Sequence, residues 1–243
     1  MSLSVSVYES PEELTEAAAH DFASKAAAAI EEGGRFAVVL AGGSTPKTAY
    51  EILARDYTET IDWGSVHVFF GDERTVPPDH EDSNYRMARE ALLDHVPVGS
   101  VHRMRGEMPP DEAASSYEDE LWGFFGAEEF PRFDLILLGI GVDGHTASLF
   151  PETSALEVAD RLVVANPVPK LNTIRITLTA PVLNTARAVN FLVAGEGKAE
   201  ALKEILEGNA DPRRYPARLV RPRSGPAVWM VDRFAASMLE NIS

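Results

Sequence analysis

The 243-residue chain contains no cysteine, so disulfide bonds, thiolate nucleophiles and cysteine-bound zinc or iron–sulfur centres are excluded. It also has no apolar run close to the roughly 20 residues that a membrane-spanning helix needs. Its N-terminus alternates apolar and polar residues and lacks the basic start and apolar block of a signal peptide. We therefore expect a cytoplasmic protein without a membrane partner.

Positive charge is scarce in the sequence. Lysine and arginine number 22 against 38 acidic residues, which gives a net charge of −16. A field of this sign repels nucleic acid, so we expect no nucleic-acid partner. It also repels phosphorylated metabolites, and such a ligand would need a local cluster of Arg, Lys and backbone N–H groups. We expect the chain to be a monomer.

Several catalytic motifs are missing as well. No G-x-S-x-G elbow offers a serine nucleophile, so a hydrolase built on this chain would have to activate water. We expect neither a metal nor another cofactor, because five of the six histidines show no metal-ligand spacing and are interpreted as surface or packing residues. These five are His20, His67, His80, His95 and His102.

Apolar strand patterns alternate with helical patterns along the whole chain, which predicts an α/β fold with a mostly parallel sheet covered by helices on both faces. The predicted strands are 3–8, 36–41, 66–70, 133–140, 161–165, 174–178, 188–194 and 227–231. The predicted helices are 11–32, 46–54, 83–94, 111–125, 198–207 and 232–241. No repeat or linker divides them, and we interpret 211–226 as a loop that could contain a short strand. A single domain over 1–243 is therefore expected.

In open parallel sheets, ligands bind beyond the carboxyl ends of the strands, and four segments there carry unusual residues. The first is Gly42-Gly43-Ser44-Thr45-Pro46, between a buried strand and a helix. Glycines allow a close approach of the backbone to an anion, and the helix N-terminus and the hydroxyls add donors. A turn capped by Thr45 would explain the same residues. The Gly-Lys-Ser/Thr ending of a P-loop is absent.

The second segment is Asp72-Glu73-Arg74, followed downstream by Ser83-Asn84-Tyr85-Arg86. Two acids and an arginine directly after a buried strand suggest a polar site. Taken alone, however, the segment favours a solvated loop with salt bridges.

The third segment, Gly139 to Gly144, satisfies G-x-G-x-x-G, the fingerprint of a dinucleotide site. Asp143 and His145 oppose that interpretation because they place ionisable groups where a pyrophosphate would lie. The next strand also leads to Asn166 instead of the expected acid. His145 is a candidate general base, which Asp143 could orient, because its ordinary pKa near 6.5 suits proton transfer at neutral pH. A structural role for this histidine remains open.

The fourth segment combines Arg175, in a strand, with Lys198, which follows Gly195-Glu196-Gly197 at the start of a helix. A lysine in the first helical turn opposes the helix dipole and is unfavourable unless an anion binds there. An ordinary surface lysine is the alternative.

Taken in this order, these segments resemble the 6-phosphogluconolactonase family from about residue 9 to residue 240. The matching stretches are 40–46, 71–74 with 83–86, 134–151 (DLILLGIGVDGHTASLFP), 175–179 and 195–198. The resemblance implies a Rossmann-like fold shared with glucosamine-6-phosphate deaminases and ribose-5-phosphate isomerases. It also implies hydrolysis of 6-phospho-D-glucono-1,5-lactone to 6-phosphogluconate, the second step of the oxidative pentose phosphate pathway.

Carried over residue by residue, the resemblance makes His145 the catalytic base, assisted by Asp143. Expected substrate and phosphate contacts are Gly43, Ser44, Thr45, Asp72, Arg74, Asn84, Gly144, Arg175 and Lys198. From the loop histidine, the cations and the missing nucleophile motifs we hypothesise that water activated by His145 attacks C1 and that the imidazolium protonates the departing ring oxygen. The chain departs from the family at 169–173, where Pro-Lys-Leu-Asn-Thr replaces a Lys-Pro-Pro type loop, and this leaves the shape of that loop open.

Two other functions compete with the lactonase. Deaminases of the same superfamily follow the Asp-Gly-His segment with a run whose Glu takes part in catalysis. Phe150 occupies that place here and cannot exchange protons, which favours the lactonase over a deaminase or isomerase. A catalytically silent sugar-phosphate sensor is the second alternative, but no DNA-binding extension precedes Leu3 and the net charge is wrong for DNA.

Overall fold

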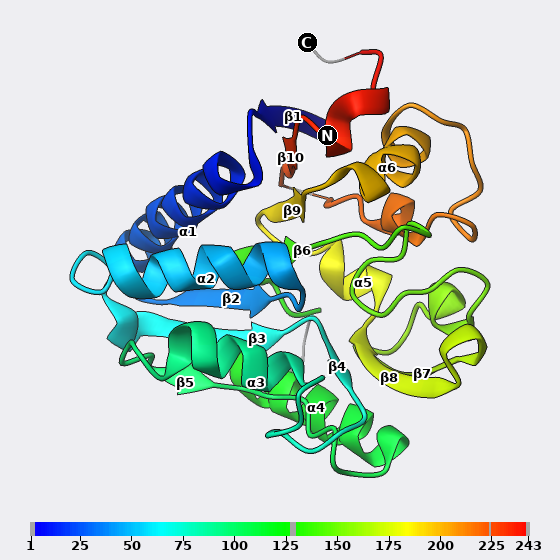
Figure 1. The fold of residues 1–243 in the computed structure, drawn as a ribbon. Coiled ribbons are helices and arrows are strands. Elements are labelled where there is room, and N and C mark those ends of the chain that lie inside the picture. Colours follow the sequence, from blue (N-terminus) through cyan, green and yellow to red (C-terminus); the bar gives the residue numbers. More distant parts are fainter. Residues whose placement is uncertain (1–2, 127–129, 224, 242–243) are drawn as a thin grey trace.

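The larger of two sheets in the computed structural model, which describes residues 3–126, 130–223 and 225–241, is entirely parallel (Figure 1). Its seven described strands run in the order β1-β10-β9-β6-β2-β3-β5, and every neighbouring pair is parallel. Their bounds are β1 (Leu3–Tyr8), β2 (Phe36–Leu40), β3 (Val66–Phe70), β5 (Ser100–Val101), β6 (Leu135–Leu138), β9 (Val189–Val193) and β10 (Ala227–Asp232). The predicted parallel α/β fold is confirmed.

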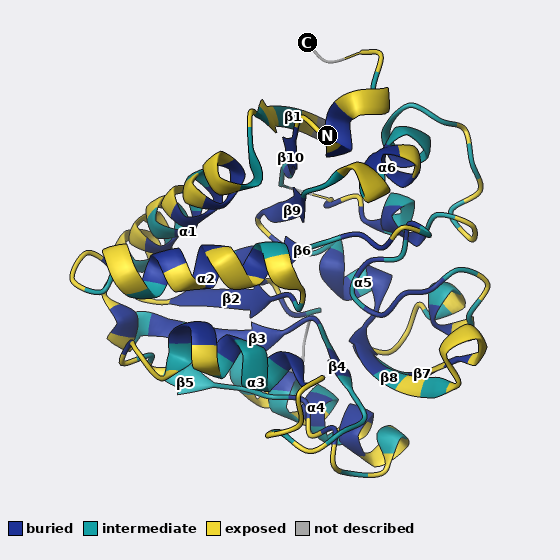
Figure 2. Cartoon of the chain, viewed as in Figure 1, coloured by how far each residue is buried: buried dark blue, intermediate teal, exposed yellow. Residues whose placement is uncertain are grey.

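Helices cover both faces of this sheet. One group comprises α1 (Pro11–Gly33), α2 (Ser44–Asp56) and α3 (Asn84–Ala88), which continues into a π-helical turn, Arg89–Leu93. The other comprises α4 (Pro110–Phe125), α5 (Ala180–Leu183) and α6 (Ala199–Leu206). In β2, Val38 belongs to the hydrophobic core on the side of α1 to α3. Its neighbour Val39 belongs to the hydrophobic core on the side of α4 to α6. Successive strand residues point to opposite faces, so these apolar runs serve two cores, shown as the dark blue centre of Figure 2.

A second, three-stranded antiparallel sheet lies beyond the carboxyl ends of β2 and β3 (Figure 1). Its order is β4-β8-β7, with the bounds β4 (Asp72–Arg74), β7 (Val163–Val168) and β8 (Thr173–Leu178). The sequence predicted β7 and β8 as strands but not this separate sheet, and it missed β4, whose three residues are all polar. The register places Arg74 directly opposite Arg175, so the small sheet brings two distant cations together.

The starts of two helices show how the local sequence directs the fold. Ser10 caps α1, because its hydroxyl accepts from the Glu13 backbone N–H at 3.2 Å and Pro11 occupies the first turn. For α2, the predicted start at Pro46 with Thr45 as a possible cap is wrong. The helix begins at Ser44, and Gly43 is the capping residue with a φ of 109°, a conformation that favours glycine.

The C-terminal segment differs from the prediction. Instead of a helix over 232–241, a 3₁₀ turn covers Ala235–Met238, and its Ala235 backbone N–H donates to the Asp232 side chain at 2.7 Å. The Glu207 carboxylate accepts the later N–H groups of Glu240 and Asn241, which therefore do not continue a helix. The other 3₁₀ turns are Trp63–Ser65, Ser154–Glu157, Pro169–Leu171, Glu196–Lys198 and Pro216–Leu219.

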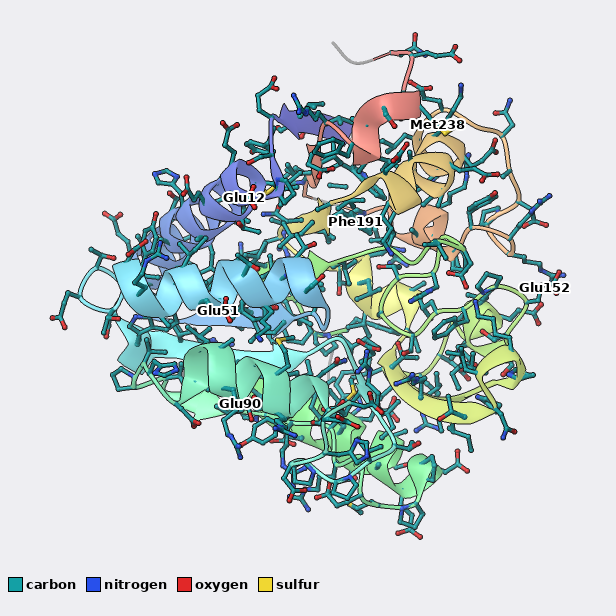
Figure 3. The ribbon with its side chains drawn as sticks, viewed as in Figure 1. Glu12, Glu51, Glu90, Glu152, Phe191 and Met238 are labelled. Carbon is teal, nitrogen blue, oxygen red and sulfur yellow. The ribbon has the colours of Figure 1, made fainter. Side chains whose placement is uncertain are left out.

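Several glutamate side chains lie on the outside of the molecule. Glu12, Glu51 and Glu90 are exposed on the outer faces of helices and point away from the sheet, whereas Phe191 lies in the core (Figure 3). Among the described helices, none combines the length and the apolar character required to cross a bilayer.

Candidate functional site

A cavity of about 440 Å³ opens where the carboxyl ends of the parallel strands meet the small sheet. That volume lies within the range of small-molecule sites. Of the predicted site residues, those that line it are Gly43, Asp72, Arg74, Asn84, Asp143, His145, Arg175 and Lys198. The structure therefore brings together residues from all four segments that the sequence singled out.

His145 lies in the loop after β6 and is held there by Asp143. The Asp143 Oδ1 atom is 2.5 Å from His145 Nδ1 and also accepts the His145 backbone N–H at 3.2 Å. An ionised carboxylate only accepts hydrogen bonds, so Nδ1 carries the ring hydrogen and Nε2 keeps a free lone pair. The loop can approach this closely because of Gly141, where an added Cβ would lie 2.0 Å from Nδ1.

The surroundings keep this imidazole uncharged. Burial is the main cause that lowers the pKa of His145 from 6.5 to about 4, and the positive charges of Lys198, Arg175 and Arg74 lower it further. The Asp72 carboxylate acts in the opposite direction. At neutral pH the ring is therefore in the form that accepts a proton. The three cations that affect it belong to three different segments of the chain.

These cations, Arg74, Arg175 and Lys198, form no salt bridge with any carboxylate of the described residues. The buried Nε of Arg175 also has no hydrogen-bond partner in the described part of the chain. Burial lowers the pKa of both Arg175 and Lys198. Half-buried cations without a salt-bridge partner are unfavourable, and an anionic ligand would relieve that cost.

Asp72 and Asn84 form a polar wall of the same cavity. The Ser148 hydroxyl donates to Asp72 Oδ2 at 2.6 Å, and Asn84 Nδ2 donates to the Asp72 backbone oxygen at 2.9 Å. Asn84 lies against Gly42, where a Cβ would meet its Oδ1 at 2.0 Å. A carboxylate repels phosphate, so Asp72 suits the hydroxyl groups of a sugar and not its phosphate.

Glu73, by contrast, points into the protein. Its carboxylate accepts the backbone N–H groups of Arg74, Asn84 and Tyr85 at 2.7–2.8 Å and the Ser83 hydroxyl at 3.0 Å. The side chain is 2% exposed, and burial raises its pKa. The solvated loop that this segment alone favoured is therefore wrong, because Glu73 ties the start of α3 to the small sheet.

Three predicted contact residues do not line the cavity. Ser44 and Thr45 belong to the first turn of α2, behind Gly42 and Gly43, whose backbone faces the cavity instead. Gly144 has a φ of 74° and abuts Tyr215, whose Cδ1 would be 2.5 Å from an added Cβ. Gly144 thus permits a turn and a close packing contact, and the hydroxyl contacts with phosphate remain a prediction.

The sequence missed Lys170, Ser148 and Phe150 as site residues. Lys170 lies in the 3₁₀ turn between β7 and β8, in the loop that departs from the family pattern, and its ammonium contacts Asp143 Oδ2. Phe150 stacks on His145 with ring centres 4.1 Å apart. The sequence could have indicated Lys170 as a site residue, because it is a cation in a loop next to the strand that carries Arg175.

The G-x-G-x-x-G segment is not followed by a helix. After β6, the described chain runs through turns until the short 3₁₀ turn Ser154–Glu157. A dinucleotide site of this type needs the N-terminus of a helix for the pyrophosphate, and the described residues directly after this segment supply none.

A second polar cluster joins β3, the segment after β5 and α4. His67 Nδ1 is 2.8 Å from Ser100 Oγ, which is 2.7 Å from His102 Nε2, and His102 Nδ1 is 2.7 Å from Glu120. This order resembles a serine triad, but none of these side chains lines the cavity that contains His145. His102 stacks on Phe69 at 4.3 Å, in agreement with the packing role predicted for it.

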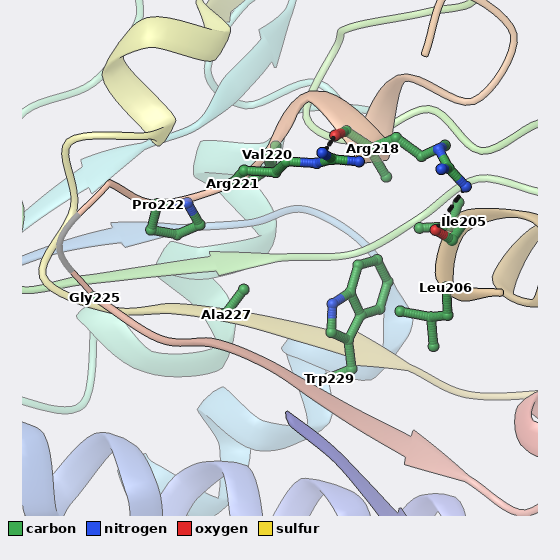
Figure 4. Close-up of a pocket in the computed structure, with 10 residues that line it drawn as sticks. Ile205, Leu206, Arg218, Val220, Arg221, Pro222, Gly225, Ala227 and Trp229 are labelled. Carbon is green, nitrogen blue, oxygen red and sulfur yellow. Dashed lines mark hydrogen bonds between the residues drawn. The ribbon is translucent and has the colours of Figure 1, made fainter. Parts of the chain in front are cut away.

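Figure 4 shows another cavity, of about 250 Å³, between α6, β10 and the loop before β10. Its described lining residues are aliphatic apart from Trp229, Arg218 and Arg221, and they include no carboxylate or imidazole that could move a proton. Arg218 is already engaged, because it donates to the backbone oxygens of Glu204, Ile205 and Gly208 at the C-terminal end of α6. We assign the chemistry to the cavity that contains His145. Within the described residues, no group of three or more acidic or histidine side chains could hold a metal ion.

Comparisons with known proteins place the chain in a family. Residues 9–229 match the family described as glucosamine-6-phosphate isomerases/6-phosphogluconolactonase. A 6-phosphogluconolactonase of Synechocystis sp. is 50% identical over 216 residues, which cover 87% of this chain and 88% of the relative. The solved 6-phosphogluconolactonase from Trypanosoma cruzi superposes with a TM-score of 0.87 at 31% identity, covering 99% and 98% of the two chains. A solved monomeric glucosamine-6-phosphate deaminase reaches 0.78 at 25% identity, with 97% and 99% covered.

Proposed function

The chain belongs to the glucosamine-6-phosphate isomerase/6-phosphogluconolactonase family, and from that premise we propose that it hydrolyses 6-phospho-D-glucono-1,5-lactone to 6-phosphogluconate. One observation carries the proposal beyond the likeness to relatives. An uncharged imidazole, oriented by a carboxylate, shares a cavity with three cations that form no salt bridge with a carboxylate of the described residues. A base and an anion site in one cavity are what hydrolysis of a phosphorylated substrate requires.

The substrate's phosphate docks on Arg74, Arg175 and Lys198. Planar guanidinium groups bind phosphate through paired hydrogen bonds, and lysine adds a point charge. The backbone at Gly42 and Gly43 lies at the N-terminus of α2, where the helix dipole also favours an anion. The negative net charge outside the cavity does not oppose binding at this short range, because water and salt screen distant charges.

His145 then acts as general base. Its Nε2 takes a proton from a water molecule, and the resulting hydroxide attacks C1 of the lactone. The tetrahedral intermediate collapses when the imidazolium returns the proton to the ring oxygen, so the bond between C1 and that oxygen breaks and the chain opens to an acid and a hydroxyl. Asp143 fixes the ring for both transfers. General acid–base catalysis of this kind contributes about 10²–10⁴-fold.

Specificity for the sugar falls to Asp72 and Asn84. Asp72 keeps its carboxylate in the cavity wall through the Ser148 hydroxyl, which leaves acceptor capacity for the hydroxyl groups of the substrate. Asn84 is held by its contact with Asp72, so the two residues present a fixed pattern of donors and acceptors. Buried patterns of this kind reject analogues that leave them unpaired.

A deaminase or isomerase of the same family is the competing function. Phe150 argues against it, because its ring covers His145 where the resemblance places a proton-exchanging glutamate in deaminases. An aromatic ring excludes water from that side of the imidazole and transfers no proton. We also propose that the chain acts as one domain and as a monomer in the cytoplasm; the core cluster that contains Ile136 of the large sheet and Ile176 of the small sheet supports the single domain.

Freshly prepared 6-phosphogluconolactone provides the test. Loss of lactone should exceed the spontaneous rate in proportion to protein concentration, while glucosamine 6-phosphate should release no ammonia in a parallel reaction. Ammonia release without lactone turnover would show that the chain is a deaminase and not a lactonase.

A further inference from the structure

We propose that Lys170 is a positioning residue for the hydrolysis, which pairs with Asp143 and thereby holds that carboxylate against Nδ1 of His145. The inference rests on the proposed function. It gives a role to the loop whose sequence departs from the family pattern. Lys170 contacts the dyad, Asp143 and His145, through Asp143. It does not belong to the phosphate cluster, which is formed by Arg74, Arg175 and Lys198.

The two oxygens of Asp143 have different partners. Oδ1 meets the His145 ring at 2.5 Å, while Oδ2 contacts the Lys170 ammonium. A carboxylate can rotate about its terminal torsion, which is broad and nearly two-fold. With a cation fixed on one oxygen, that rotation is restrained, and the other oxygen stays in the plane that the imidazole N–H needs.

A second contact places Lys170 beside the same ring system. Its ammonium lies 4.9 Å from the centre of the Phe150 ring, and Phe150 stacks on His145. An ammonium is attracted to the face of an aromatic ring at this distance. Lys170 is thus connected to His145 through Asp143 on one side and Phe150 on the other.

The backbone brings the lysine to this position. β7 and β8 are joined by the 3₁₀ turn Pro169–Leu171, and Asn172 completes the connection in the left-handed conformation with a φ of 48°. Asparagine tolerates that conformation better than most residues. Because β8 also carries Arg175, one hairpin supplies both a cation at the phosphate cluster and the cation on the dyad.

The charges around His145 give the role a measurable signature. Asp143 and Asp72 are the acids that face the ring, and Lys170, Lys198, Arg175 and Arg74 are the cations. Lys170 offsets the charge of Asp143. Its removal leaves that carboxylate uncompensated beside the ring, which favours the imidazolium and raises the pKa of His145.

The experiment compares Lys170→Met with Lys170→Arg and with a matched control, Lys47→Met, which removes an exposed lysine on α2 that pairs with Glu51 at 3.7 Å. In the full-length protein, Lys170→Met should lower kcat about 10- to 100-fold, because a misaligned base costs this much. KM should change less than about threefold, since the phosphate cations are intact. Lys170→Arg should recover most of kcat, and Lys47→Met should match the wild type.

A second readout needs no turnover. Proton–nitrogen NMR of the labelled His145 ring reports which nitrogen carries the hydrogen and at what pH the ring titrates. Lys170→Met should populate the other tautomer and titrate at higher pH than the wild type. An unchanged tautomer and titration would overturn the proposal, as would a variant whose only defect is a higher KM.

The two hypotheses fail in different ways. If the wild-type protein does not hydrolyse the lactone, the proposed function is wrong, and the NMR comparison still decides whether Lys170 positions the dyad. If the wild type is active and Lys170→Met retains its kcat, only the role of Lys170 is lost. Should Lys170→Met fold poorly, the same spectra of Lys170→Arg test the claim, because restored charge must preserve the tautomer.

Discussion

Phosphate binding should raise the basicity of His145. In the free protein, burial and three cations hold the pKa of this imidazole at about 4, against an ordinary 6.5. The difference corresponds to about 3 kcal/mol against the imidazolium. A phosphate docked on Arg74, Arg175 and Lys198 offsets the cationic part of this effect, while the part due to burial, the largest, remains.

The expected size follows from Coulomb's law. A unit negative charge about 8 Å from the ring, at an effective dielectric constant near 20, favours the imidazolium by about 2 kcal/mol. This would raise the pKa by about 1.5, to between about 5 and 6. The substrate thus improves the base that attacks it, and an unphosphorylated lactone would lose catalysis as well as binding.

NMR titration of the His145 ring measures this directly. Rate profiles are less suitable, because the phosphate of the substrate itself titrates near pH 6. Sorbitol 6-phosphate supplies the phosphate without a carboxylate at C1, and sorbitol is the matched control. The ring should titrate near pH 4 in the free protein and with sorbitol, and above pH 5 with sorbitol 6-phosphate. A free-protein value near 6.5, or no change with sorbitol 6-phosphate, would refute the reasoning.

Three further predictions concern single substitutions. His145→Ala should lower kcat by about 10²–10⁴-fold with little change in product affinity, and unchanged turnover in a lactone assay would remove His145 from its role. Lys198→Ala should lower kcat/KM about 10- to 100-fold, mainly through KM, because a charge-assisted contact with phosphate is lost; Lys203→Ala, on the outer side of α6 and paired with Glu240, is the control and should keep wild-type kinetics. Glu73→Gln should lower the free energy of unfolding by about 2–3 kcal/mol in urea denaturation, because an amide cannot accept all the N–H groups that the carboxylate binds, whereas the exposed Glu51→Gln should change it by less than about 0.5 kcal/mol; equal stabilities of the two variants would contradict the buried network.

The central sheet could be predicted because its strands are short, continuous apolar runs. A run such as 36–40 contributes buried side chains to both hydrophobic cores, and few other structures accommodate that pattern. The small sheet could not be predicted in the same way. β4 has three polar residues, and its pairing with β8 joins residues about a hundred positions apart, which no local pattern records.

The candidate site was predictable in its residue types more than in its contacts. The predicted strands placed the segments of His145, Arg175 and Lys198 at the edge of the sheet where ligands bind, and in the structure the three residues line one cavity. The orientation of Glu73 into the core and the pairing of Lys170 with Asp143 depend on how the small sheet folds over the large one. Both are nonlocal contacts, and charge pattern alone does not distinguish them from surface salt bridges.

A crystal structure of the protein with 6-phosphogluconate would test the central claim most directly. We expect the phosphate to contact Arg74, Arg175 and Lys198 and the C1 carboxylate to lie within about 3.5 Å of His145 Nε2, the separation of a near-attack geometry. A phosphate bound away from these cations, or C1 at the end of the cavity remote from His145, would contradict the account.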